Sequence, residues 1–217
     1  MHKSIYNLNQ IQKLLKEKTE KKNIPKIVAV SKTFPISDIQ PLLEHGHIDY
    51  GENKIQEAVD KWSSIKEKFQ NIKLHMVGKI QTNKVKFLLP LFDYLHSLDN
   101  LKLARKISIE QEKKKKKLKI FIQVNIGNEI QKSGVSIEYL QEFYSICTKE
   151  LNLDIIGLMC LPPNDDNTKS YFAEMQKLNT KFKLNELSMG MSNDYLTAVE
   201  YNSTFVRIGS KIFGNRN

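Results

Sequence analysis

The sequence has few cysteines and no long apolar run, and both absences narrow the class of protein. Only two cysteines occur in 217 residues, Cys147 and Cys160, and neither belongs to a Cys-x-x-Cys pair or to a cluster with histidine. A structural zinc site and a disulfide framework are therefore not expected. No apolar stretch approaches the length that crosses a bilayer, and the polar start Met1-His2-Lys3 lacks the apolar core of a secretion signal. We expect a cytoplasmic protein with no membrane segment.

The sequence also has fewer acidic than basic residues. The chain has 34 Lys and Arg against 24 Asp and Glu, a formal net charge of +10. A basic balance can indicate nucleic-acid binding, but lysine is abundant throughout this sequence. The densest run, Lys113 to Lys117, follows an acidic segment, as the end of a solvated helix would. Because no aromatic side chains interleave with that run to stack on bases, we expect no specific nucleic-acid site.

Short apolar strands alternate with helical segments along the whole chain. The predicted strands are 27–31, 48–51, 74–78, 93–97, 119–125, 154–159, 185–189 and 204–208. The predicted helices are an opening one with Ile5, Leu8, Ile11, Leu14 and Leu15 on one face, one capped by Ser37 and ending at Gly46, one over 55–69, one capped by Ser136, and one over 168–182.

This alternation predicts an α/β fold, with a parallel sheet closed into a (β/α)8 barrel over one domain, residues 1–217. The last strand leaves few residues for an eighth helix, so we expect the extra N-terminal helix to cover that gap. An open doubly wound sheet is the alternative. It is less favoured because the sequence has no Gly-x-Gly-x-x-Gly turn.

In such a barrel the functional groups gather where the strands end at the carboxyl face. Lys32 ends the first strand, directly after an apolar run. A lysine there is costly to desolvate, and partial burial lowers the pKa of its amine, which frees the lone pair to attack a carbonyl. The alternative is a lysine whose ammonium reaches out to solvent, and this segment alone favours that interpretation.

The last two strand ends resemble a phosphate cradle. Ser192 precedes an expected helix over 194–201, and Gly209-Ser210 opens a second helix start. Free N–H groups at helix N-termini bind phosphate, and glycine lets the backbone approach closely. Either segment alone is typical of a simple helix cap. Two adjacent segments facing Lys32 favour an anion site.

Arg207 lies within an apolar strand and needs an acceptor, because its guanidinium stays protonated. Two partners are equally open: a carboxylate in a salt bridge at the barrel mouth, or a ring nitrogen or anionic group of a ligand.

Other polar residues at strand ends have simpler interpretations. His75 and His96 share no metal-like spacing with other histidines, so hydrogen bonding at strand ends is expected, and no metal site is predicted. Cys160 is expected in the core. Glu52 and Asp99 are expected to be solvated or to cap helices.

Several segments together resemble one protein family. They are VAVSKT (28–33), GENKIQE (51–57), HMVG (75–78), QTNK (81–84), HSLD (96–99), QVN (123–125), KSG (132–134), GLM (157–159), LSMGMS (187–192), VRIGS (206–210) and IFG (212–214). In this order, and over almost the whole chain, they resemble the pyridoxal phosphate homeostasis protein family. The departures are modest: Leu74 stands where the family often has an aromatic residue, and Ser210 where threonine is common.

The resemblance implies a barrel like the N-terminal domain of alanine racemase that binds pyridoxal 5′-phosphate (PLP). Lys32 matches the lysine that holds the cofactor as a Schiff base. Ser192, Gly209 and Ser210 match phosphate-binding positions. Arg207 matches the arginine that faces the pyridine nitrogen.

Further positions carry weaker matches. Asn53 and Met159 match positions that line the cofactor. Lys132 matches a family lysine near the pocket mouth, and the sequence leaves open whether Lys132 or Lys79 binds a second PLP molecule.

The function implied by the resemblance is intracellular PLP homeostasis: PLP is held on Lys32 and released or transferred to other proteins, PLP-dependent apoenzymes among them. An arginine opposite the pyridine nitrogen disfavours its protonation, which weakens the ring as an electron sink. Racemases of this fold add a tyrosine base from a separate domain of a partner subunit, and we expect no such domain here. We therefore expect no catalytic turnover; the alternative is a PLP-dependent enzyme acting on a small amine or amino acid. We also expect a monomer, although the sequence itself does not reveal the oligomeric state.

Overall fold

The protein folds as a closed barrel of parallel strands in chain order. The computed structural model describes residues 1–19, 24–129 and 131–214. The strands are β1 (Lys26–Val30), β2 (Asp49–Glu52), β3 (Lys73–Met76), β4 (Tyr94–Leu98), β5 (Lys119–Val124), β6 (Asp154–Cys160), β7 (Glu186–Met191) and β8 (Phe205–Ile208). Strand β8 pairs with β1 and closes the ring. The predicted (β/α)8 fold is confirmed, and every predicted strand overlaps an observed one.

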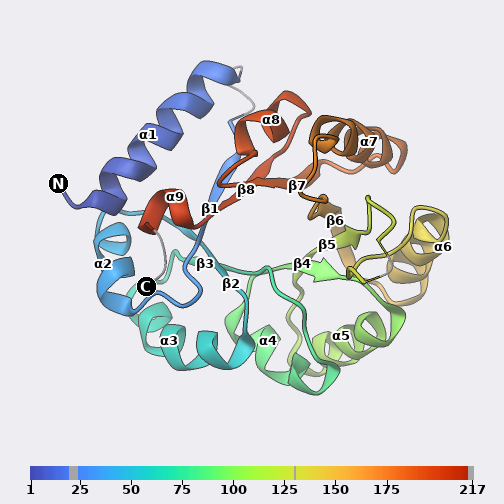
Figure 1. Ribbon diagram of the computed structural model, residues 1–217. Helices are drawn as coiled ribbons and strands as arrows, with labels where there is room; N and C mark the ends of the chain where they lie inside the picture. The colour runs from blue at the N-terminus through green and yellow to red at the C-terminus, as the bar shows by residue number, and fades with distance from the viewer. Residues whose placement is uncertain (20–23, 130, 215–217) are drawn as a thin grey trace.

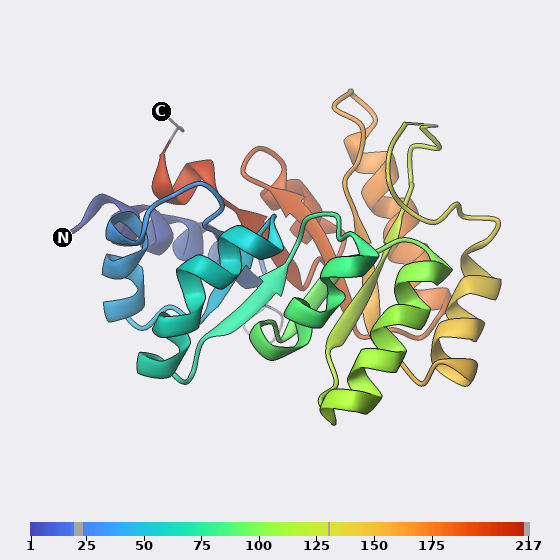
Figure 2. The ribbon, with the colours of Figure 1, turned by 90° about the horizontal axis from the view of Figure 1, so that it is seen from below.

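Helices surround the strands on the outside of the barrel (Figure 1). They are α1 (Lys3–Lys18), α2 (Ile36–Glu44), α3 (Ile55–Lys68), α4 (Val85–Leu91), α5 (Leu101–Lys114), α6 (Leu140–Ser145), α7 (Thr168–Lys181), α8 (Tyr195–Glu200) and α9 (Ser210–Phe213), with a 3₁₀ turn at Thr82–Lys84 and a π-helical turn at Ile146–Glu150. The loops that follow β5 and β6 rise from one end of the barrel (Figure 2).

Helix α1 covers the gap that the short α9 leaves in the ring. It packs against α2, α8 and α9 (Figure 1), as predicted for the extra helix. Its buried stripe includes Leu8, Ile11 and Leu15, whereas Leu14, expected on that face, is 40% exposed. The prediction that Ser37 caps the next helix is wrong, because α2 already begins at Ile36, after the extended Pro35.

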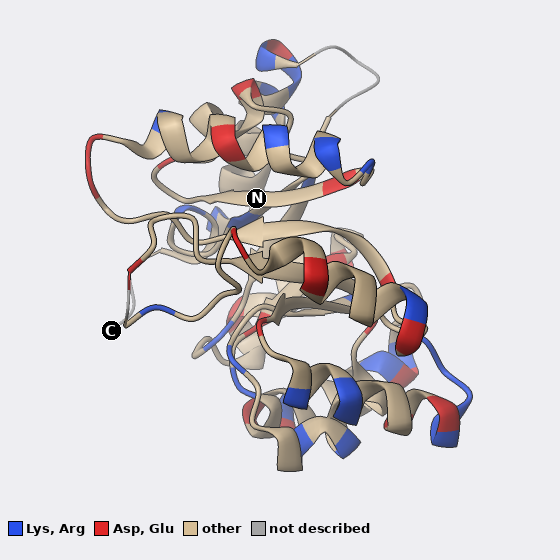
Figure 3. Cartoon of the chain, turned by 90° about the vertical axis from the view of Figure 1, so that its right-hand side faces the viewer, with Lys and Arg blue, Asp and Glu red and all other residues tan. Residues whose placement is uncertain are grey.

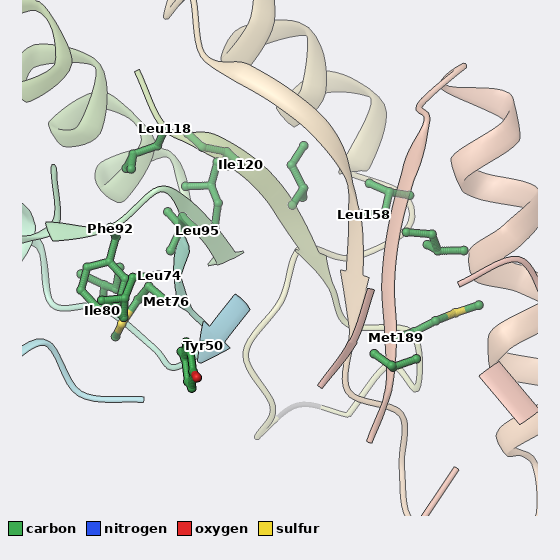
Figure 4. Close-up of a cluster of buried hydrophobic side chains, with 14 of the residues drawn as sticks. Tyr50, Leu74, Met76, Ile80, Phe92, Leu95, Leu118, Ile120, Leu158 and Met189 are labelled. Atoms are coloured by element: carbon green, nitrogen blue, oxygen red, sulfur yellow. The ribbon is translucent and has the colours of Figure 1, made fainter. Parts of the chain in front are cut away.

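The core has two layers, as barrel geometry requires. The larger layer lies between the strands and the helices, and part of it is drawn in Figure 4. A smaller cluster fills the barrel interior and consists of Val28, Tyr94, Phe121, Met159 and Phe205. Alternate residues of one strand thus serve different layers.

Charged side chains lie mainly on the outer helices and loops. On the face shown in Figure 3, Lys and Arg are interspersed with Asp and Glu. The lysine-rich run ends α5 as predicted, with Lys113 and Lys114 in the last turn and Lys115 as a left-handed cap. Within the described residues, none of the helices combines the length and apolarity needed to cross a bilayer.

A buried ion pair ties β2 to α3. Glu52 is fully buried and accepts hydrogen bonds from Ser31 Oγ at 2.8 Å, Trp62 Nε1 at 2.9 Å and Lys61 Nζ at 3.1 Å. Lys61 Nζ also donates to the Ser31 carbonyl at 3.0 Å. The expectation that Glu52 is solvated or caps a helix is therefore wrong: its side chain points between strand and helix, where only hydrogen bonds and a cation make a carboxylate tolerable. This contact anchors the backbone just before Lys32.

Replacing Lys61 tests this anchor. Lys61→Met leaves the buried Glu52 carboxylate without its cation and should lower the free energy of unfolding by about 3–5 kcal/mol. Urea denaturation followed by circular dichroism measures the change. Lys68→Met, on the exposed end of the same helix, is the matched control and should stay within about 0.5 kcal/mol of the wild type. Equal stability of the two variants would show that the pair contributes nothing to the fold.

Candidate functional site

A cavity of about 690 Å³ opens at the carboxyl end of the barrel, a volume typical of small-molecule sites. The predicted site residues that line it are Lys32, Asn53, Ser192, Arg207, Gly209 and Ser210. Met159 is not among the lining residues; it is fully buried in the interior cluster. The structure thus brings six of the seven predicted residues to one cavity, and their roles toward a cofactor stay predictions.

The turn after Lys32 is held by α3. Thr33 has a φ of 67°, a left-handed conformation that is unfavourable for a β-branched residue. Its backbone N–H donates to Glu57 Oε1 at 2.6 Å. Burial opposes ionisation of Glu57, but this N–H and the nearby Lys61 outweigh it and keep the pKa of Glu57 below its usual value. Contacts from α3 therefore fix the backbone conformation next to Lys32.

Arg207 lies on β8 and is only 4% exposed. Its Nη1 donates to Ser188 Oγ at 2.6 Å and its Nη2 to the Cys160 carbonyl at 2.8 Å. Within the described residues no carboxylate lies within ion-pair distance of it, although Asp194 acts on it at longer range. Of the two partners left open by the sequence, the salt bridge is not formed there. The N–H groups not used by Ser188 and Cys160 remain for a ligand.

The two predicted anion-binding segments lie side by side. The backbone N–H of Lys211 donates to Ser192 Oγ at 3.5 Å, which joins the loop after β7 to the start of α9. A Cβ on Gly209 would lie 3.1 Å from the Val30 carbonyl, so glycine lets β8 pass close to β1. The helix expected over 194–201 is α8, Tyr195–Glu200, and it and α9 are short. Because both helices are short, the donors available to an anion are hydroxyls and individual backbone N–H groups, and the helix dipoles contribute less.

Asn53 follows β2 and lines the same cavity. A Cβ on Gly78 would collide with the Asn53 carbonyl and side-chain oxygens. Only glycine therefore lets the end of β3 pack against Asn53 at this distance.

The loop after β6 and residue Asp194 also line the cavity, and the sequence analysis missed both. A Pro162-Pro163 pair directly after a predicted strand is the signal that could have indicated a stiff rim. The Asp194 carboxylate accepts the backbone N–H of Met191 at 2.5 Å. Among the described lining residues the charged groups are thus two cations, Lys32 and Arg207, and one carboxylate, which favours an anionic ligand.

Other candidate residues lie elsewhere. Lys132 pairs with Glu129, Lys79 is exposed, and neither lines the cavity. His75 and His96 are hydrogen-bonded to each other at 3.0 Å, inside the barrel and not at its rim. In the part of the chain that the structure describes, no cluster of side chains suits a metal ion. Cys160 is buried as predicted, and burial raises the pKa of its thiol to about 12.

Comparison with known proteins identifies relatives of the whole chain. The family model for the alanine racemase N-terminal domain matches residues 4–217. A pyridoxal phosphate homeostasis protein from Aquifex aeolicus is 35% identical over 96% of this chain and 95% of its own length. The structure of PipY from Synechococcus elongatus with PLP bound is 26% identical, covers 97% of this chain and 100% of that one, and has a TM-score of 0.86. PipY has also been solved without PLP.

More distant structures share the fold. Alanine racemase from Corynebacterium glutamicum is 14% identical, with a TM-score of 0.73, and the match covers 98% of this chain and 60% of that one. The full-length matches above place this chain in the pyridoxal phosphate homeostasis protein family, built on the alanine racemase N-terminal domain fold.

Proposed function

We propose that the protein binds PLP through Lys32, holds it reversibly, and releases or transfers it to other proteins. The observation that carries the proposal is the set of groups on one cavity: an amine, two hydroxyls, a glycine backbone and a buried guanidinium. A relative, PipY, has been solved with and without PLP, which supports reversible binding.

These residues fit the chemistry of PLP group by group. Ser192, Ser210 and the backbone at Gly209 supply donors for a phosphate. Arg207 supplies N–H donors for a ring nitrogen, and Lys32 supplies a primary amine. When bound, the cofactor contributes an aldehyde that reacts reversibly with amines.

The residues around Lys32 favour holding the cofactor over catalysis. Arg207 cannot accept a proton, so it keeps a ring nitrogen that faces it in the unprotonated form. This lowers the ability of the ring to stabilise a carbanion. Among the described lining residues the remaining ionisable group besides Lys32 is Asp194, whose carboxylate already accepts a backbone N–H. Storage and release need no further base.

The attachment point is the first test. Purified protein should be yellow, and borohydride should bleach it and leave one labelled peptide, containing Lys32. Lys32→Ala should lose both colour and label, whereas Lys132→Ala, outside the cavity, should keep them. Mass spectrometry of the digested protein locates the label. A label on another lysine in the wild type would contradict the proposal.

The phosphate cradle is the second test. In the double variant Ser192→Ala with Ser210→Ala, each lost hydrogen bond to a charged group removes about 1.5–3 kcal/mol, so the Kd for PLP should rise about a hundredfold or more. Absorbance titration measures the Kd, and circular dichroism checks the fold. Ser192→Thr with Ser210→Thr keeps both hydroxyls and should bind nearly as the wild type does. An unchanged Kd in the alanine variant would remove the cradle from the site.

A third test separates a carrier from an enzyme. The PLP-loaded protein should restore activity to a PLP-dependent apoenzyme. In deuterated water it should exchange the α-protons of amino acids no faster than Lys32→Ala does, as NMR can measure. Exchange that is faster than in Lys32→Ala would favour the alternative, a PLP-dependent enzyme acting on a small amine or amino acid.

A further inference from the structure

Five polar side chains form one continuous hydrogen-bond chain through the barrel. Asp49, the first residue of β2, lies 2.9 Å from His75 Nε2 through its Oδ1. His75 Nδ1 lies 3.0 Å from His96 Nε2, and His96 Nδ1 lies 2.8 Å from Ser188 Oγ. Arg207 Nη1 completes the chain at Ser188 Oγ. The chain joins the amino end of the barrel, where the Asp49 side chain is 19% exposed, to the cavity at the carboxyl end.

The Asp49 end, together with the neutral state of both imidazoles, fixes the direction of the hydrogen bonds in the chain. Arg207 only donates, so Ser188 Oγ accepts from it; because a hydroxyl has two lone pairs, this contact alone leaves the direction between Ser188 and His96 open. The Asp49 carboxylate only accepts, so His75 Nε2 carries a proton. A neutral His75 then has a bare Nδ1, and His96 Nε2–H donates to it. A neutral His96 then has a bare Nδ1, so Ser188 Oγ donates to it, and both imidazoles are in the Nε2–H form.

Burial and stacking hold both imidazoles in that arrangement. The His75 ring stacks on Tyr94 with centroids 4.3 Å apart, and the His96 ring stacks on Phe121 at 4.4 Å. Desolvation by burial lowers the pKa of both histidines, and His75 and Arg207 lower that of His96 further. With both rings neutral and fixed in plane, each hydrogen bond between these side chains contains one proton.

Such a chain orients Arg207; it does not conduct protons. Moving a proton along it would leave a neutral guanidinium beside the cavity, which the high pKa of arginine forbids. With one Nη1 proton directed to Ser188 and one Nη2 proton to the Cys160 carbonyl, the guanidinium plane is fixed. Its other N–H groups are then presented to whatever occupies the cavity that Arg207 lines.

We propose that Asp49, His75, His96 and Ser188 are positioning residues that orient Arg207 from the opposite end of the barrel. None of the four lines the cavity in the described residues. The inference rests on the proposed function only in taking PLP as the ligand that meets Arg207.

The direction of the hydrogen bonds in the chain can be tested without PLP. Long-range ¹H–¹⁵N correlation spectra of labelled protein should show His75 and His96 as neutral Nε2–H tautomers. Rotation of the Arg207 Nη groups should be slow in the wild type and fast in Ser188→Ala. An Nδ1–H tautomer or a charged ring at either histidine, or fast rotation in the wild type, would overturn the proposal.

Substitution of Asp49 tests whether the far end of the hydrogen-bond chain affects binding in the cavity. Asp49→Ala removes the terminal acceptor, and PLP should dissociate about tenfold faster, the equivalent of roughly one hydrogen bond. Asp49→Asn keeps an accepting oxygen and should dissociate at nearly the wild-type rate. Asp154→Ala removes an exposed carboxylate at the same end of the barrel, outside the chain, and should also match the wild type.

Equal dissociation rates in Asp49→Ala and Asp154→Ala would overturn the proposal. Failure of the wild type to bind PLP would instead contradict the proposed function, and the tautomers and the Arg207 rotation would still decide on the chain.

Discussion

The buried charge of Arg207 is the constraint on which much of the barrel interior depends. Arg207 is 4% exposed, and its guanidinium keeps its proton and has no ion-pair partner within the described residues. A charge in that position is tolerable only with hydrogen bonds to fixed dipoles, here Ser188 and the Cys160 carbonyl. Ser188 Oγ also contacts His96 Nδ1, and from there a polar path continues through the aromatic interior to His75. That path ends at Asp49, where a negative charge reaches solvent.

A separate set of charges positions the other cation of the cavity. Glu57 holds the strained turn at Thr33, and Lys61 bridges Glu57 and the buried Glu52. These contacts come from β2 and α3, whereas the chain behind Arg207 runs through β2, β3, β4 and β7. The two networks share no side chain, but both start from β2, through Glu52 in one and Asp49 in the other. Lys32 and Arg207 line the same cavity.

The sequence predicted those parts of the site that depend on backbone geometry. Parallel strands end at one face, so residues at strand ends, such as Lys32 and Ser210, meet at one cavity. Met159 does not line the cavity, because side chains alternate along a strand. It pairs with Ser188 and, like Ser188, points into the barrel. Two other features could not be predicted: the burial of Glu52 and the hydrogen bond between the two histidines. Both depend on which face of the strand each side chain occupies and on neighbours far away in the sequence. No local sequence pattern indicates either.

Histidine is the side chain best suited to moving protons near neutral pH, and both buried histidines of this protein lie inside the barrel. His75 and His96 have every ring nitrogen engaged inside the barrel. Neither lines the cavity in the described part of the chain. The hydrogen-bond chain thus engages both imidazoles away from the cavity. Arg207 in turn disfavours a protonated pyridine ring. Under the proposed function, this hydrogen-bond chain would strengthen binding, and the lack of a histidine base among the described cavity residues and a weaker electron sink would both favour storage of PLP over carbanion chemistry.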